Sequence, residues 1–119
     1  MDKAFAQRLA TEWIAAWNSH DLDRILSHYT DDFEMNSPRI VEYMNEPSGR
    51  LTGKEKVRAF WAVGLLRNPD LHFTLSGVYA GASSVAIHYR NEKGLGVSEV
   101  LFFDASGRVF RAAAHYADC

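Results

Sequence analysis

Cysteine, proline and clusters of positive charge are scarce in this chain. Cys119, the last of 119 residues, is its only cysteine. No intrachain disulfide can therefore form, and we expect a reducing, cytoplasmic setting. A thiol at a chain end, without activating neighbours, is more often inert than nucleophilic. Lys and Arg number 13 against 15 Asp and Glu, with no basic run, which argues against nucleic acid as a partner.

Long apolar runs are also absent. No stretch reaches the roughly 18 apolar residues of a membrane span, and the N-terminus lacks the basic-then-apolar order of a signal peptide. Apolar residues nevertheless make up 47% of the chain and aromatic residues 13%. That is enough for one hydrophobic core, and the length suits a single domain. We therefore predict one domain over residues 1–119.

The last third of the chain is rich in β-branched and aromatic residues, which predicts four strands. Residues 72–80 and 84–91 form the first two. Residues 96–103 and 109–116 flank a turn whose Asp, Ser and Gly residues favour reversal of the chain, so they form a long hairpin. Four successive strands joined by short turns predict an antiparallel meander.

Glu99 lies in the middle of an otherwise apolar strand face. Alternation of side chains puts it on the same side as Val97, Leu101 and Phe103. A carboxyl group there is either paired, or exposed to a cavity, or raised in pKa by desolvation. A desolvated Glu99 would serve as a proton donor or base near neutral pH. The alternative is a structural carboxyl, held by arginine or tyrosine without turnover.

The first two thirds of the chain predict three helices and one strand. Residues 3–18 carry apolar residues at helical spacing, and Asp21 suits the N-cap of a short second helix. Residues 52–55 resemble a capping box ahead of a third helix that runs to about residue 67. Residues 33–37 predict a strand that Pro38 ends. Three helices beside one curved sheet make an α+β arrangement.

Residues 39–52 predict an irregular loop, marked by Pro47 and Gly49. A loop of this length in a small domain is often a lid over a site. It can equally be a simple connector between a strand and a helix. The sequence favours neither interpretation.

His88 is a second titratable candidate, and its position relative to Glu99 depends on strand register. A two-residue turn would place His88 opposite Glu99 as a dyad. A three-residue turn with Gly94 as a bulge would place Ile87 there and turn His88 outward. Asn91 and the apolar alternation of this strand favour the longer turn. Because sequence determines register weakly, both alternatives stay open.

Four segments resemble the nuclear transport factor 2-like superfamily, which includes SnoaL-like domains and ketosteroid isomerase. They are residues 17–23, 29–33, 53–61 and 103–109. The resemblance implies a cone of three N-terminal helices packed on a curved, mostly antiparallel sheet around an apolar pocket. It also implies a homodimer through the outer sheet face. The scaffold hosts isomerases, cyclases, hydrolases and non-catalytic binders, so it identifies no single reaction.

Comparison with ketosteroid isomerase assigns individual positions by resemblance. Its protonated oxyanion-hole acid falls on Glu99, its oxyanion-hole tyrosine on Trp13, and its supporting tyrosines on Tyr29 and Trp61. Its general base falls on Ser37. A serine cannot take a proton from carbon without a base of its own. The resemblance therefore argues against steroid isomerisation by that mechanism.

We expect a pocket for a small, largely apolar molecule that bears a ring or a carbonyl group. Glu99 would act as acid or base, assisted by Tyr29, in an isomerase, cyclase or hydrolase; the alternative is a non-catalytic binding or dimerisation domain. No His or Cys pair has metal-ligand spacing, although a site of scattered His and Glu residues stays open. No glycine motif cradles phosphate, so we expect no cofactor. The expected pocket wall consists of Trp13, Trp17, Phe33, Met35, Ser37, Phe60, Trp61, Leu101, Phe103 and Tyr116.

Overall fold

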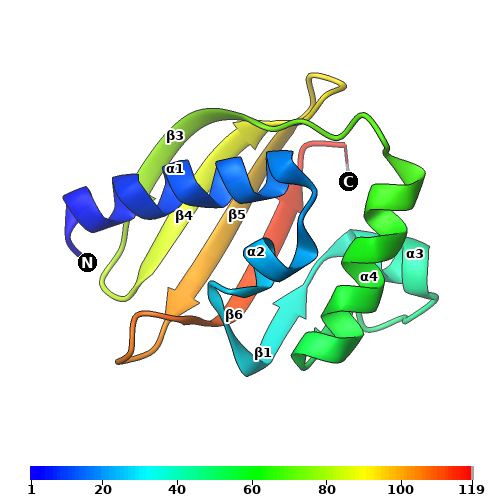
Figure 1. Ribbon diagram of the computed structural model, residues 1–119, viewed down its shortest axis with the longest axis horizontal. Coiled ribbons are helices and arrows are strands. Elements are labelled where there is room, and N and C mark those ends of the chain that lie inside the picture. Colours follow the sequence, from blue (N-terminus) through cyan, green and yellow to red (C-terminus); the bar gives the residue numbers. More distant parts are fainter. Residues whose placement is uncertain (119) are drawn as a thin grey trace.

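The computed structural model describes residues 1–118, and Cys119, whose thiol we expect to be inert, lies outside the described residues. Helices cover one face of a six-stranded sheet (Figure 1). No helix in the described part of the chain is long and apolar enough to cross a membrane. The elements in chain order are α1 (Lys3–Ser19), α2 (Leu22–Leu26), β1 (Tyr29–Asn36), α3 (Pro38–Met44), β2 (Arg50–Thr52), α4 (Lys54–Arg67), β3 (Thr74–Ala80), β4 (Ser84–Arg90), β5 (Gly96–Phe103) and β6 (Val109–Tyr116).

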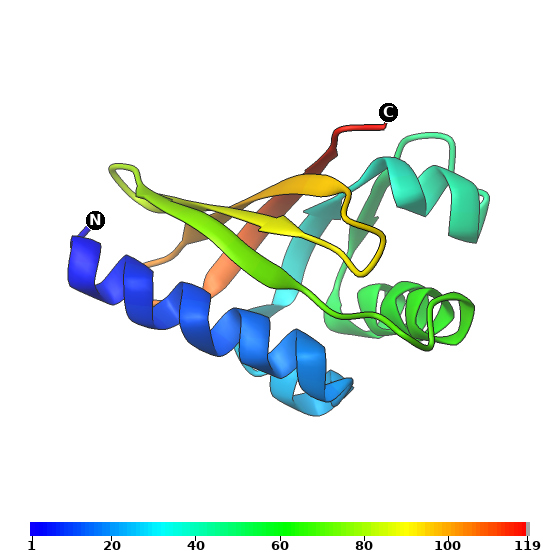
Figure 2. The same ribbon diagram turned by 90° about the horizontal axis from the view of Figure 1, so that it is seen from above.

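The sheet is mixed and mostly antiparallel. Its strands lie in the order β2-β1-β6-β5-β4-β3, and β3 to β6 form the predicted meander. β1 begins at Tyr29 rather than at Phe33, and it pairs in parallel with β6. Figure 2 shows the twist of the sheet, with α1 along one face. The α+β prediction is confirmed, whereas the sequence did not predict the parallel pair.

The first two helices begin at side-chain caps. Asp2 accepts a backbone amide hydrogen bond at the start of α1. Asp21 accepts two amides at the start of α2, as predicted. α1 stops at His20, which has a left-handed φ of 61°. The buried face of α1 carries Trp13 and Trp17 towards the sheet.

The capping box expected at residues 52–55 does not form. Thr52 instead ends β2, where it pairs with Glu34 of β1. The N-cap of α4 is Gly53 at φ 97°, an angle that glycine adopts without strain, and no side chain caps this helix. Strand pairing holds the Thr52 backbone in the sheet, so its side chain is not placed to cap the helix.

The prediction of an irregular loop over residues 39–52 is wrong, because the segment contains α3 and β2. Pro38 ends β1 as predicted, but it also occupies the first turn of α3, where its fixed φ and missing N–H suit a helix. Ser37 caps α3 by accepting the Arg39 amide at 3.1 Å. α3 packs against α4. The described chain therefore has four helices where three were predicted.

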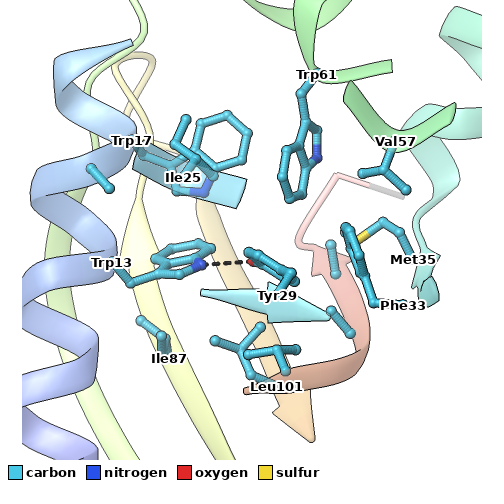
Figure 3. Close-up of a cluster of buried hydrophobic side chains, with 14 of the residues drawn as sticks. Trp13, Trp17, Ile25, Tyr29, Phe33, Met35, Val57, Trp61, Ile87 and Leu101 are labelled. Atoms are coloured by element: carbon cyan, nitrogen blue, oxygen red, sulfur yellow. Dashed lines mark hydrogen bonds between the residues drawn. The ribbon is translucent and has the colours of Figure 1, made fainter. Parts of the chain in front are cut away.

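Aromatic rings fill the core between the helices and the inner face of the sheet (Figure 3). Trp13 and Tyr29 meet there, and both are buried. Trp13 Nε1 donates a hydrogen bond to the Tyr29 hydroxyl at 2.9 Å. Tyr29 also packs on Phe33, with ring centroids 4.4 Å apart. Because a buried N–H needs an acceptor, this hydrogen bond ties α1 to β1.

We expect Tyr29→Phe to lower the free energy of unfolding by about 1–3 kcal/mol, because it leaves the buried Trp13 N–H without an acceptor. Urea unfolding followed by tryptophan fluorescence measures the loss. Tyr79→Phe is the matched control, since Tyr79 is 59% exposed and should lose little. Equal stability of the two variants would contradict a structural role for the Trp13–Tyr29 bond.

Candidate functional site

A cavity of about 300 Å³ lies where α3, α4 and the β4–β5 turn meet the inner face of the sheet. Residues of α1, β1, β5 and β6 complete its walls, so most of the chain contributes to it. Small-molecule pockets span roughly 300–1,000 Å³. The cavity is therefore large enough for a small ligand.

The predicted wall residues divide into two groups. Trp13, Phe33 and Leu101 are buried in the core instead of lining the cavity (Figure 3). Phe103 packs edge-to-face on Phe5, with ring centroids 5.6 Å apart. Alternation predicts the face of a strand on which a side chain lies, but the cavity covers only one end of that face. The predicted residues that line it are Glu99, Trp17, Met35, Ser37, Phe60, Trp61 and Tyr116.

Glu99 lies in the middle of β5 with 4% of its surface exposed. Its Oε1 accepts a hydrogen bond from the Tyr89 hydroxyl at 3.3 Å, a long distance for an O–H···O bond. Burial raises the pKa of Glu99 from 4.5 to about 7, and the bond from Tyr89 partly offsets this rise. Near neutral pH, Glu99 is therefore present both as the acid and as the carboxylate.

Three tyrosines lie within electrostatic range of Glu99: Tyr29 on β1, Tyr89 on β4 and Tyr116 on β6. Burial raises the pKa of each hydroxyl above 10, and the Glu99 charge raises it further. All three therefore stay neutral near pH 7. Tyr29 does not line the cavity, whereas Tyr89 and Tyr116 do. Tyr89 is thus better placed than Tyr29 to assist Glu99.

His88 does not form a dyad with Glu99. In the β4–β5 register Ile87 lies opposite Glu99, and His88 lies opposite Ser98. His88 is on the outer face, where its ring lies 4.8 Å from that of Tyr79. Among residues 1–118, no group of three or more His, Cys, Asp or Glu side chains is placed to hold a metal ion.

The turn between β4 and β5 explains this register. The Asn91 amide donates to the Leu95 carbonyl at 3.0 Å, which leaves three residues in the turn. Gly94 adopts φ 78°, as expected for the longer of the two turn alternatives. The Asn91 side chain also accepts the Lys93 and Leu95 amides. A single asparagine therefore stabilises the turn that sends His88 outward.

The profile of the SnoaL-like domain matches residues 10–117. The chain belongs to the SnoaL-like family. A SnoaL-like protein of unknown function from Burkholderia thailandensis E264 is 57% identical to it, with a TM-score of 0.93 over 98% of this chain and 97% of that one. The family resemblance seen in the sequence is thereby confirmed.

Structures of lower sequence identity share the fold of this chain. One is described as a candidate isomerase of the SnoaL-like family from Agrobacterium tumefaciens strain C58, with 16% identity and a TM-score of 0.76 over 95% of this chain and 97% of that one. Another is TerC co-crystallised with polyporic acid, with 15% identity and a TM-score of 0.77 over 96% and 92% of the two chains. None of the curated proteins compared with the chain matches it.

The candidate site contains aromatic and charged residues that the sequence did not assign to the pocket. Tyr89, the hydrogen-bond partner of Glu99, has one signal in the sequence, since alternation along β4 turns it inward with Ile87. Phe73 follows Pro69 in a segment without regular structure, yet its ring lies 4.2 Å from that of Tyr89. Only long-range packing brings Phe73 to the cavity.

Charged side chains from three separate segments form the rim of the cavity. They are Arg39 and Glu42 of α3, Glu92 and Lys93 of the β4–β5 turn, and Asp118. Arg39 Nη2 donates to both oxygens of Asp118 at 3.0 Å, which joins α3 to the segment after β6. α3 is thus neither a separate lid nor a simple connector, because it forms one side of the cavity.

We expect the free energy of unfolding to fall by about 3 kcal/mol as pH rises from 4.5 to 7, because of Glu99 alone. Its pKa in the folded protein, about 7, lies above the value of 4.5 in the unfolded chain. Below pH 4.5 both states are protonated and the contribution is fully present. As pH rises through 7, the folded state loses a proton that the unfolded state has already released, and the contribution is lost.

Urea unfolding of the wild type and of Glu99→Gln between pH 4 and 8 measures this effect. Glutamine keeps the shape of the side chain without its titration, so the variant should gain stability relative to the wild type across this pH window. Glu55→Gln, at an exposed position of α4, controls for the loss of one acid. Parallel stability curves for all three proteins would show that Glu99 is not desolvated.

Proposed function

We propose that this SnoaL-like protein binds a small, largely apolar molecule bearing a ring or a carbonyl group, and that Glu99 acts on it as a general acid or base. The proposal is carried by a buried carboxyl group at the wall of a cavity, without a cation beside it. None of the ion pairs within residues 1–118 includes Glu99. A buried carboxyl without a charged partner lowers stability, so a functional role accounts for it better than a structural one.

Proton transfer near neutral pH is the chemistry that this site would support. A general acid or base is most efficient when its pKa lies near the working pH, and that of Glu99 is about 7. As a carboxylate, Glu99 would take a proton from a carbon next to a carbonyl group, and the electron pair would move onto the carbonyl oxygen. The neutral hydroxyl of Tyr116 would donate to that oxygen, while Tyr89 keeps its hydrogen bond to Glu99.

Three reaction classes follow from this common step. Return of the proton from Glu99 to a different carbon gives an isomerisation. Attack of the enolate carbon on a second carbonyl carbon of the same molecule gives a ring closure, and the new alkoxide takes the proton back from Glu99. A hydrolase would instead use Glu99 to take a proton from a water molecule as the water attacks the substrate, and Glu99 would then give that proton to the leaving group.

Steroid isomerisation by the ketosteroid isomerase mechanism lies outside the proposal. The position of its base is Ser37, whose hydroxyl accepts the Arg39 amide as the N-cap of α3. Ser37 lines the cavity but does not abstract protons from carbon by itself. On the side of the cavity lined by Ser37, the substrate or a water molecule would have to supply the base.

Distant relatives support the proposal at the level of the fold alone. The Agrobacterium structure is described as a candidate isomerase, and TerC was co-crystallised with polyporic acid. At 16% and 15% identity they carry no substrate over to this chain. They agree with a fold that serves both small-molecule binding and catalysis.

We expect Glu99→Gln to slow proton transfer by about 10²–10⁴-fold, the usual contribution of a general acid or base. Cyclic ketones and enones that raise the melting temperature would be incubated with the protein in D₂O, and exchange at the carbon next to the carbonyl followed by NMR. Tyr89→Phe should retain exchange but move its pH midpoint upward, because the Tyr89 bond lowers the pKa of Glu99. Undiminished exchange in Glu99→Gln would rule out the proposed role.

A non-catalytic binding or dimerisation domain is the second candidate function. Two aromatic side chains on strands are exposed to solvent, Tyr79 at 59% and Phe110 at 43%. Phe110 is exposed because a bulge in the β5–β6 pairing puts Val109 opposite Phe103 and turns Val109 inward. Exposed aromatic residues are enriched at protein interfaces. This observation favours the expected homodimer through the outer sheet face, which stays a prediction.

Sedimentation equilibrium tests the homodimer directly. We expect the wild type to sediment as a dimer and the double variant Tyr79→Ser, Phe110→Ser as a monomer, because the aromatic contact area is lost. A double variant at exposed Leu66 and Val41, on the helices, controls for a general effect of lower surface hydrophobicity. A wild type that is monomeric at high concentration would exclude this interface.

A further inference from the structure

Within residues 1–118, no cationic side chain lies beside Glu99 in the cavity. The two cationic residues of the described lining, Arg39 and Lys93, belong to the rim. Arg39 is paired with Asp118 at 3.0 Å and with Glu42 at 3.5 Å. The hydrogen bond from the neutral Tyr89 hydroxyl is the one polar contact that Glu99 makes in the described chain. An ionised Glu99 would therefore gain from a positive charge brought by the ligand.

Aromatic rings make up a third of the cavity lining, seven of 21 residues. Trp17 and Trp61 meet edge-to-face with centroids 5.0 Å apart, and Phe73 and Tyr89 pack at 4.2 Å. Together they form a continuous aromatic wall next to the Glu99 carboxyl. A cation within about 6 Å of an aromatic face is stabilised by the ring quadrupole. Aromatic walls with one carboxylate are typical of sites for ammonium groups.

Two other rings that line the cavity already contact cations of the protein itself. The guanidinium of Arg39 lies 4.4 Å from the centre of the Tyr116 ring, and that of Arg67 lies 4.6 Å from the centre of the Tyr43 ring. Both tyrosines line the cavity. These contacts occupy Tyr116 and Tyr43 with arginines of the protein, so we assign the ammonium contact to the wall of Trp17, Trp61, Phe73 and Tyr89.

The charge at the rim points in the same direction. Within the described residues the rim holds two cationic and three acidic side chains, an excess of one negative charge. Ionisation of Glu99 adds a second negative charge within the cavity. Such a field concentrates cations at the entrance and repels anions. A ligand with a carboxylate or phosphate group would meet unfavourable electrostatics here.

We infer that the ligand of this cavity carries a cationic nitrogen, an alkylated or quaternary ammonium group that contacts the aromatic wall and pairs with the Glu99 carboxylate. The inference rests on the proposed function and narrows its substrate class to ring-bearing ammonium compounds. With the cation bound, Glu99 is held as the carboxylate, so it would act as the base. The proton it loses on binding is released to solvent.

The pH dependence of binding separates this ligand from a neutral one. An ammonium ligand needs the ionised form of Glu99, whose pKa is about 7 in the empty cavity. Its affinity should rise by about tenfold from pH 6 to pH 8. A neutral carbonyl ligand accepts from a tyrosine hydroxyl that stays neutral over this range, so its affinity should not rise. The other titratable groups facing Glu99 are the hydroxyls of Tyr29, Tyr89 and Tyr116, which stay neutral.

Calorimetric titration of the full chain with benzyltrimethylammonium and with its neutral isostere neopentylbenzene provides the test. We expect the cation to bind more tightly at pH 8, and its advantage over the isostere to shrink about tenfold at pH 6. Glu99→Gln should reduce the advantage to what the aromatic wall provides and abolish the pH dependence. Glu92→Gln, which removes one acidic group from the rim, should weaken binding slightly and retain the pH dependence. The wild-type titrations decide the question even if Glu99→Gln fails to fold.

Each result tests either the inference or the proposed function on which it rests. Tighter binding of the cation with rising pH supports the inference. Equal binding of the cation and the isostere, or weaker binding of the cation at pH 8, overturns it. If 2-cyclohexenone binds while the cation does not, the inference falls and the proposed function stands. If none of the three compounds binds, both fall.

Discussion

The chemistry proposed for this protein depends on a carboxyl group held away from water on the inner face of β5. Buried residues alternate along β5, and Glu99 occupies one of the buried positions. The flanking strands place Ile87 on one side and Ala114 on the other. Neither supplies a charge, so desolvation dominates and the pKa of Glu99 rises to about 7. Three tyrosines lie within electrostatic range of that carboxyl. The aromatic wall and the charged rim belong to the same cavity.

An acid in this position costs stability at neutral pH, and the fold tolerates it because the surrounding core is dense. Trp13 stacks on Phe73 at 6.1 Å, and Phe73 packs on Tyr89 at 4.2 Å. The Tyr29 hydroxyl accepts from the Trp13 N–H, and the Tyr89 hydroxyl donates to Glu99. Burial of these aromatic rings therefore offsets the free-energy cost of desolvating Glu99. Such a cost is expected where stability is given up for function.

Much of the fold followed from local patterns. Helical spacing predicted α1, the Asp21 cap predicted α2, and alternation predicted the inward position of Glu99. The candidate site followed only in part, because alternation does not show how far along a strand a cavity extends. Leu101 therefore shares the face of Glu99 but lies in the core. The Asn91 turn, in contrast, carried a local signal for the register that turns His88 outward.

The sequence by itself determined most helical and extended segments, α3 and β2 excepted, and which side chains of β5 face inward, because these depend on residues close together in the chain. Only the tertiary structure decided that α3 forms a wall, that β1 pairs in parallel with β6, and that Arg39 meets Asp118. Such contacts join segments far apart in the chain, and their energy depends on how whole elements pack. No short pattern of residues encodes that packing.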